Sequence, residues 1–245
     1  MITRHRTVSA ALCAGLLLAL GAGPASAAEV PEKVRQTIND ANSVLTTMAA
    51  PGSKQIPPAV LQGAICVASL PNITKGAFIF GGEGGKGVIS CREKDGKWGP
   101  PLMISLASAS VGFQIGVEQS NLVLVMFSRK TASNLVDGGL KFGANASASA
   151  GPYGAKAGAP MNPDESPIFT YATNEGLMAS AALNGTSVKP ADRDNQLLYD
   201  KGTVPADAVL LPEPGKAWPV PAAAQGFLDT LDKVAGHKAP KTKKK

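Results

Sequence analysis

Short apolar segments separated by glycines and polar turns constrain the fold of this chain more than any other feature. They lie at 64–70, 76–80, 87–91, 111–117, 122–127, 142–150, 166–171 and 177–183. Each has the length of a β-strand rather than of a helix. With 27 glycines and only 17% charged residues, the chain lacks the composition of a helical bundle or coiled coil. The sequence therefore predicts a β-rich core with tight turns.

Helical patterns stand at the two ends of this β-rich region. Residues 30–49 carry apolar side chains at steps of three or four, and Pro31 suits a first helical turn. Residues 221–235 show a second such pattern, which ends at Gly236. We expect the first helix to pack against the sheet. The alternative is a helix that lies in a membrane interface. Its polar face has only two basic residues, which is a weak signal for membrane binding.

The fold prediction is an α+β single domain. It has a mainly antiparallel β core, an N-terminal amphipathic helix and a C-terminal helix. Shorter helical turns are expected at 59–62, 131–136 and 195–199, and an extended proline-rich stretch at 204–220.

The first 27 residues have the pattern of a secretory signal peptide. Arg4 and Arg6 precede an apolar stretch at 8–23, and Ala25-Ser26-Ala27 forms a small-residue cleavage site. The apolar stretch is shorter than the about 20 residues that span a bilayer. Lipidation at Cys13 is disfavoured because Leu12 precedes it where a small residue is needed. We expect a domain at 28–236 in a periplasmic or secreted protein, peripheral on a membrane at most.

The positive charge is concentrated in the tail at 237–245. Without the signal peptide the chain has 22 basic and 18 acidic residues, and five of the lysines lie within 238–245. The remaining body has 17 basic and 18 acidic residues, a net charge of −1. This distribution argues against a nucleic-acid-binding face. The tail is either a solvated, disordered end or an electrostatic tether to anionic lipid.

Two cysteines remain after signal removal, Cys66 and Cys91. In an oxidising compartment an even pair favours a disulfide, and two buried free thiols are the alternative.

The histidines exclude much catalytic chemistry. His5 leaves with the signal peptide and His237 begins the tail. The domain therefore has no imidazole to act as a base or as a metal ligand. We expect no catalytic residues, no metal and no cofactor. Carboxylate-pair chemistry stays open, since acidic residues distant in sequence meet in some folds. The candidates are Glu83, Glu118, Asp137 and Glu175.

A glycine-rich run at 81–87 contains a G-x-G-x-x-G match at Gly82, Gly84 and Gly87. A dinucleotide site requires a helix to follow, whereas the pattern after Gly87 is that of a strand. A P-loop also fails, because Gly87 follows Lys86 in place of Ser or Thr. The run is interpreted as a tight structural turn. The alternative is a phosphate-binding loop in which Lys86 assists the amides of Gly82, Gly84, Gly85 and Gly87.

Several motifs together resemble the SYLF domain over about residues 30–205. They are Ile56-Pro57-Pro58, Ala64-Ile65, Lys75-Gly76, the run from Phe80 to Val88, Trp98, Gly112-Phe113-Gln114-Ile115-Gly116, Leu122-Val123-Leu124-Val125, Gly143-Ala144-Asn145-Ala146-Ser147, Ala150-Gly151-Pro152, Tyr171 and Glu175-Gly176-Leu177. Cys66 and Cys91 are not part of this family pattern and look like an adaptation to export.

The resemblance implies binding rather than catalysis. Eukaryotic members bind phosphoinositide-containing membranes, some yeast relatives bind actin, and lipid binding is the usual proposal for exported bacterial members. Actin is not expected in a bacterial envelope. The predicted function is therefore a non-enzymatic module that binds anionic phospholipid in the cell envelope. The expected lipid contacts are Lys33, Arg35, Lys75, Lys86, Lys243, Lys244 and Lys245.

The alternative is a structural or protein-partner scaffold of the envelope. Under that hypothesis the small-residue strand at 144–150 and the proline-rich stretch present flat surfaces to another protein.

Overall fold

A computed structural model of the chain describes residues 29–52, 56–77, 81–110, 116–150, 168–173, 183 and 185–236. The predicted signal peptide and lysine-rich tail lie outside these ranges. The described strands form one mainly antiparallel sheet with the order β5-β8-β3-β2-β1-β4-β7-β6. The strands are β1 (Cys66–Ala77), β2 (Gly81–Cys91), β3 (Leu102–Ser110), β4 (Gly116–Met126), β5 (Leu140–Lys141), β6 (Ala148–Ala150), β7 (Ile168–Ala172) and β8 (Thr186–Pro190). The helices are α1 (Glu32–Ala49), α2 (Pro58–Gly63), α3 (Arg129–Val136), α4 (Asp192–Tyr199), α5 (Ala206–Leu210) and α6 (Gln225–Ala235), with a short 3-10 turn at Ala222–Ala224.

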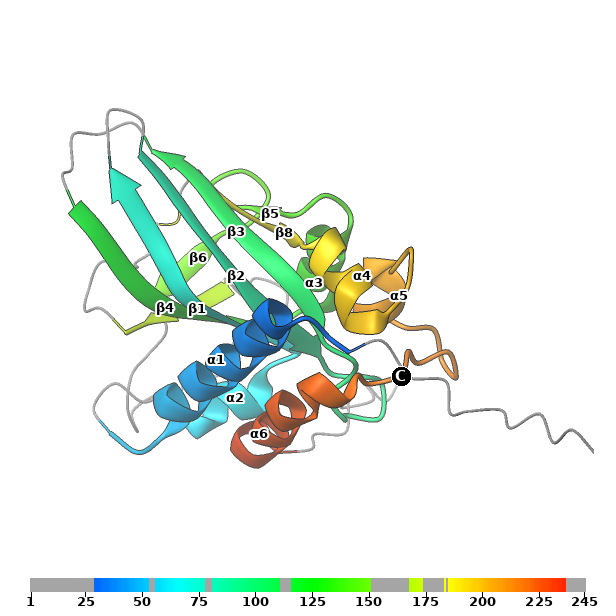
Figure 1. Ribbon diagram of the computed structural model, residues 1–245. Helices are drawn as coiled ribbons and strands as arrows, with labels where there is room; N and C mark the ends of the chain where they lie inside the picture. Colours follow the sequence, from blue (N-terminus) through cyan, green and yellow to red (C-terminus); the bar gives the residue numbers. More distant parts are fainter. Residues whose placement is uncertain are drawn as a thin grey trace, which may run out of the picture.

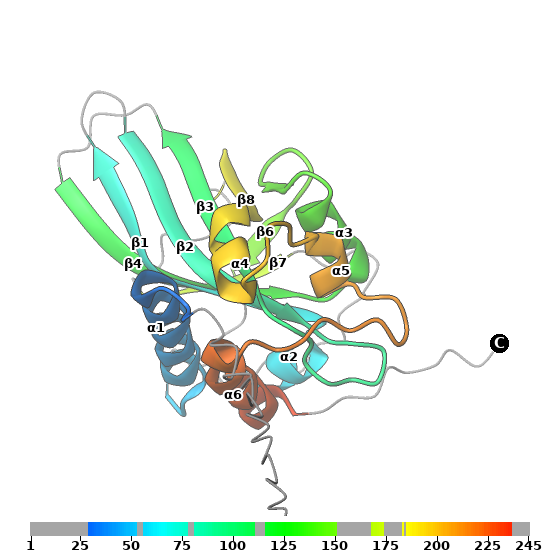
Figure 2. The same cartoon turned by 45° about the vertical axis from the view of Figure 1, so that its right-hand side comes forward.

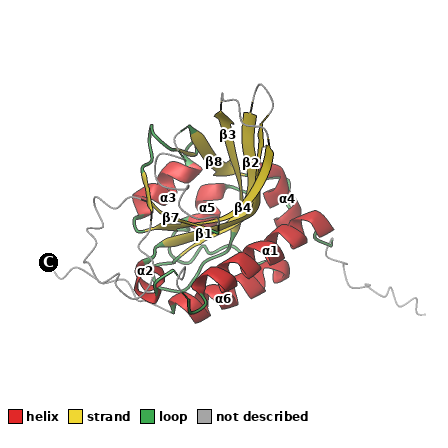
Figure 3. Ribbon diagram, turned by 90° about the vertical axis from the view of Figure 1, so that its left-hand side faces the viewer, coloured by secondary structure: helices red, strands yellow, loops and turns green. Residues whose placement is uncertain are grey.

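Helices cover both faces of the sheet, and this α+β arrangement confirms the predicted fold class (Figure 1). α1 and α6 lie side by side against one face, whereas α3 and α5 lie on the other (Figures 2 and 3). Residues 66–70 of β1 and 122–126 of β4 are therefore buried on both sides. This burial explains why 66–70 and 122–126 are continuous rather than alternating apolar runs.

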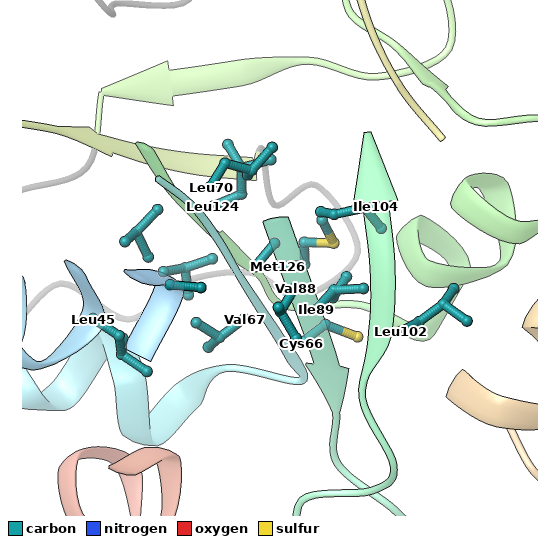
Figure 4. Close-up of a cluster of buried hydrophobic side chains, with 14 of the residues drawn as sticks. Leu45, Cys66, Val67, Leu70, Val88, Ile89, Leu102, Ile104, Leu124 and Met126 are labelled. Atoms are coloured by element: carbon teal, nitrogen blue, oxygen red, sulfur yellow. The ribbon is translucent and has the colours of Figure 1, made fainter. Parts of the chain in front are cut away.

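The predicted N-terminal helix packs against the sheet as expected. Six side chains of α1 are buried, at the helical spacing of the sequence pattern: Val34, Ile38, Ala41, Val44, Leu45 and Met48. Ser69 of β1 donates a hydrogen bond of 2.8 Å from Oγ to the carbonyl of Ala41. Leu45 of α1 and Val67 of β1 belong to the same buried cluster (Figure 4). The apolar face of α1 is consequently occupied by the core, which rules out the membrane-interface alternative for this conformation.

Strand β1 contains a bulge that accommodates Pro71 in a central strand. The register shifts by one residue against both β2 and β4 between Ser69 and Thr74. Proline has no amide hydrogen to donate to a neighbouring strand, and a bulge is where a sheet tolerates it. Asn72 follows with a φ of 50°, and its amide donates to Oδ1 of Asn121 on β4 at 2.9 Å.

The glycine-rich run is not the predicted turn but part of strand β2, and this corrects the sequence interpretation. Gly84 pairs with Thr74 of β1 and with Ala107 of β3, so its backbone belongs to two ladders. A Cβ placed on Gly87 would lie 2.3 Å from the carbonyl oxygen of Ser69. The glycine at 87 thus serves the close approach of β2 to the bulged β1 rather than a tight turn.

One further turn prediction was wrong, and two strands were missed. The polar residues 118–121 do not form a turn, because β4 continues through them as one strand. Strands β3 and β8 were missed. Small residues dominate the second half of β3, which weakens the alternating pattern, and β8 has only five residues. The predicted segments at 78–80, 111–115 and 177–182 lie outside the described residues.

The predicted disulfide is present between Cys66 and Cys91. These residues are directly opposite each other in the register of β1 and β2, and both are buried. The disulfide therefore joins two strands that already pair in the folded sheet.

Candidate functional site

The candidate site begins at the hairpin that follows β2. The amide of Glu93 donates to the carbonyl of Lys97 at 2.8 Å, and Gly96 adopts a φ of 92°. Positive φ favours glycine, so the Asp95-Gly96 pair forms the turn that the sequence predicted. A bridge between Arg92 and Trp98 closes the hairpin.

Arg92 connects this hairpin to the C-terminal helix. Its buried guanidinium donates to the carbonyls of Ala235 at 3.0 Å, Gly236 at 2.6 Å and Gly96 at 2.8 Å. It also lies 4.2 Å from the centre of the Trp98 ring. A cation at the last carbonyls of a helix complements the helix dipole. Burial lowers the pKa of the Arg92 guanidinium from its ordinary value, and the nearby Asp232 acts in the opposite direction.

This contact places the end of α6. Because one nitrogen of Arg92 donates to both Gly96 and Gly236, the end of α6 lies beside the tip of the hairpin. The five lysines within 238–245 follow Gly236 in the sequence.

Arg129 is held against the backbone at the end of β2. It is the first residue of α3, whose N-cap Ser128 accepts a hydrogen bond from the amide of Thr131. The Nη2 atom of Arg129 donates to the carbonyl of Arg92 at 2.7 Å. The guanidinium is therefore fixed by backbone without a carboxylate partner among the described residues.

The proline-rich stretch forms the third side of a cavity that also borders the hairpin and α3. Lys216 donates its amide to the carbonyl of Glu213 at 3.0 Å, and Gly215 has a φ of 79°. With Pro214 in the second position, these features define a type II turn. A cavity of about 270 Å³ lies between this turn, the hairpin and α3. It is lined by Glu93, Lys94, Asp95, Arg129, Pro212, Glu213, Pro214, Gly215 and Ala217.

The charged side chains of this cavity differ in their partners. Asp95 pairs with Lys97 at 3.6 Å, and Glu213 pairs with Lys216 at 2.9 Å. Within the described part of the chain, Glu93, Lys94 and Arg129 have no ion-pair partner. The cavity therefore presents two cations and one carboxylate whose charges are not balanced by a neighbouring side chain, an arrangement that suits a small polar ligand.

The basic residues expected to bind lipid do not form one cluster with this cavity. Arg35 of α1 pairs with Glu32 and with Glu29, which precedes the helix, and the hydrogen bonds to these two carboxylates raise the pKa of its guanidinium, that to Glu32 most. Lys33 is exposed on the same helix. Lipid contact by either residue stays a prediction.

The two basic residues expected from β1 and β2 have acidic neighbours. Nζ of Lys86 lies 2.5 Å from Oδ2 of Asp194 on α4. The Lys86 side chain is 43% exposed and that of Asp194 only 11%, so Lys86 balances a largely buried charge. In the strand register Lys75 stands opposite Glu83 on one side and Glu118 on the other. The ion pair with Asp194 weakens the expectation of free positive charge at Lys86, whereas lipid contact by Lys75 stays a prediction.

The alternative phosphate role of Gly82, Gly84, Gly85 and Gly87 stays a prediction, which their place in a strand does not favour. The amides of a strand paired on both sides are directed along the sheet, whereas a phosphate nest needs successive amides that converge. Lys243, Lys244 and Lys245 lie outside the described residues.

No group of three or more His, Cys, Asp or Glu side chains is placed to hold a metal ion within the described residues. None of the helices described has the length and apolar character needed to cross a bilayer.

Sequence reasoning missed the residues that surround the cavity. Glu93, Lys94 and Arg129 come from two segments more than 30 residues apart, and none belongs to a recognisable motif. The only available signals were the two turns, Asp95-Gly96 and Pro214-Gly215, which mark where the walls reverse direction. Which turns would meet depends on the tertiary fold.

Comparison with known proteins identifies relatives. The model of the Ysc84 family, described as "Las17-binding protein actin regulator", matches residues 107–234. The chain is 32% identical to Protein YSC84 of Saccharomyces cerevisiae over 179 residues, which cover 69% of this chain and 38% of that protein. It is 30% identical to LAS seventeen-binding protein 3 of the same species, over 69% of this chain and 39% of the relative.

A human relative extends the comparison. SH3 domain-containing YSC84-like protein 1 of Homo sapiens is 30% identical, over 73% of this chain and 51% of the human protein. The matched region thus spans between about two fifths and half of the length of these relatives. No solved structure matches the chain significantly. The relatives are named for binding and for SH3 domains rather than for an enzymatic reaction. The family model and the three relatives together show that this chain belongs to the Ysc84 family, the group of SYLF-domain proteins.

Proposed function

We propose that this chain is a non-enzymatic module that binds anionic phospholipid at the surface of an envelope membrane. The observation that carries the proposal is the gathering of cations at one end of the molecule. Lys94, Arg129 and the adjacent Lys130 have no ion-pair partner among the described residues. The same end holds Gly236, from which the lysine-rich segment continues.

The strength of such an interaction can be bounded. A Lys or Arg near an anionic membrane surface contributes about 1 kcal/mol, and the attraction decays within the Debye length of about 8 Å at physiological salt. Lys94, Arg129, Lys130 and the lysines of the tail would act together. Without these three cations the rest of the body has 14 basic and 18 acidic residues, so this end would determine the orientation of the protein on the membrane.

Co-sedimentation with phosphatidylglycerol vesicles tests the proposal. We expect binding to fall with added salt, with deletion of 238–245, and with the double variant Lys94→Glu/Lys130→Glu. Lys141→Glu/Lys189→Glu is the matched control, since both are exposed lysines on the strands β5 and β8. A control variant that loses as much binding as Lys94→Glu/Lys130→Glu would contradict docking through this end. Absence of binding at every salt concentration would refute lipid binding itself.

A protein-binding scaffold is the second candidate. One relative, matched in two strains of Saccharomyces cerevisiae, carries a name that states binding to LAS seventeen. In this chain Pro214, Pro219 and Val220 of the proline-rich stretch are exposed, and extended proline-rich segments are common ligands of binding domains. This candidate predicts a stoichiometric partner that is lost with Val220→Asp and retained with Lys94→Glu. Retention in both variants would argue against it.

A further inference from the structure

The cavity beside the hairpin combines a cation held by a backbone hydrogen bond with a half-buried carboxylate. The guanidinium of Arg129 is held by its 2.7 Å hydrogen bond to the carbonyl of Arg92. The Glu93 side chain lies against Gly99, where an added Cβ would stand 3.2 Å from Cγ and 3.3 Å from Oε1 of Glu93. Neither charge is balanced by another described side chain, so both are available to one ligand.

The composition of the lining defines the chemistry of that ligand. Lys94 and Arg129 provide donors for an anion, and Glu93 provides an acceptor for a cation. A simple phosphate would meet the two cations but would be repelled by the nearby carboxylate. A ligand that carries a phosphate and an amine a few bonds apart satisfies all three groups.

The size of the cavity further limits which ligands it can hold. Its volume of about 270 Å³ is slightly below the range of about 300–1,000 Å³ typical of drug-sized ligand pockets. Five of the nine lining residues are charged, and the cavity is too small to hold a whole phospholipid. The cavity is therefore suited to a polar headgroup whose lipid tails remain outside.

We propose that this cavity binds the phosphoethanolamine headgroup of a membrane phospholipid. The phosphate accepts hydrogen bonds from Arg129 and Lys94, and the primary ammonium donates to the carboxylate of Glu93. This inference rests on the proposed function and adds headgroup selectivity to it. The cation-rich end draws the protein to the surface, and the cavity then distinguishes a primary ammonium from a trimethylated one, which has no N–H donor.

Vesicles of matched charge test this selectivity. Phosphatidylglycerol is kept constant, and the second lipid is either phosphatidylethanolamine or phosphatidylcholine. Partly exposed charge pairs contribute about 0.2–1 kcal/mol, so we expect up to about fivefold tighter binding with phosphatidylethanolamine. Glu93→Gln should remove the preference while binding to phosphatidylglycerol persists. Asp95→Asn is the matched control in the same hairpin and should keep the preference, because Asp95 is already paired with Lys97.

A titration with soluble headgroup compounds separates headgroup recognition from membrane effects. Titration calorimetry compares phosphoethanolamine with glycerol phosphate, and we expect only the former to lose affinity in Glu93→Gln. Equal vesicle binding with either lipid, or a preference that survives in a folded Glu93→Gln variant, would overturn the headgroup inference and leave the proposed function intact. Failure to bind any anionic vesicle would instead overturn the proposed function.

Discussion

Reduction of the Cys66–Cys91 disulfide should destabilise the protein by an amount set by the chain that it closes. The two cysteines are separated by 25 residues and are buried partners on adjacent strands. The chain-entropy relation gives about 3.5 kcal/mol at 25 °C for a loop of this length. Since the strands pair in the folded state regardless of the bond, the cross-link acts mainly by restricting the unfolded chain.

The measurement is urea unfolding of the oxidised protein against protein that is reduced while unfolded and then refolded with reductant. Reduced protein keeps both sulfur atoms, so the comparison isolates the cross-link from the packing lost in Cys→Ala variants. We expect a lower midpoint by roughly 1–2 M urea and a larger dependence on urea, because the reduced unfolded chain exposes more surface. A difference below about 1 kcal/mol would refute the entropic argument for this loop.

Two further predictions concern β2 and the buried tyrosine of α4. Gly87→Ala should cost about 2–3 kcal/mol in urea unfolding, because its Cβ would lie 2.3 Å from the Ser69 carbonyl. Gly84→Ala, whose Cβ would have no described neighbour closer than 3.9 Å, should stay within about 0.5 kcal/mol, and equal losses would contradict the close-approach argument. Tyr199 donates to the Pro101 carbonyl at 2.6 Å, and burial raises the pKa of its hydroxyl. Its contribution is thus fully present below the unfolded pKa of about 10 and is lost as pH rises above it, so stability should fall at alkaline pH and fall less steeply in Tyr199→Phe. Unfolding free energies measured from pH 8 to 11 that show the same slope in both proteins would contradict this.

Helix periodicity and strand length were strong enough to predict much of the fold from sequence. The apolar spacing of 30–49 gave the packed helix α1, because side chains three or four residues apart share one face in any helix. The turn at Asp95-Gly96 was predicted because glycine tolerates positive φ. The Cys66–Cys91 bond followed from pairing in an oxidising compartment. By contrast, the glycine run at 81–87 was wrongly predicted to be a turn. Glycine is common both in tight turns and where strands pack closely, so the sequence does not distinguish the two.

The candidate site could not be predicted in the same way. Lys86 reads as a free cation in the sequence, but the fold places Asp194 beside it from a helix more than 100 residues later. Arg92 likewise has no motif around it, although it fixes the end of α6 against the hairpin.

The amino-acid sequence by itself determined the α+β class, the two terminal helices and the lack of histidine in the domain, since these depend on local periodicity and on composition. Only the tertiary structure decided which charges are neutralised and which face a common cavity. Local pattern fixes the conformation of a segment and the face that it buries. The partners of an ionic side chain depend instead on which distant segments the sheet and its covering helices bring within a few ångströms.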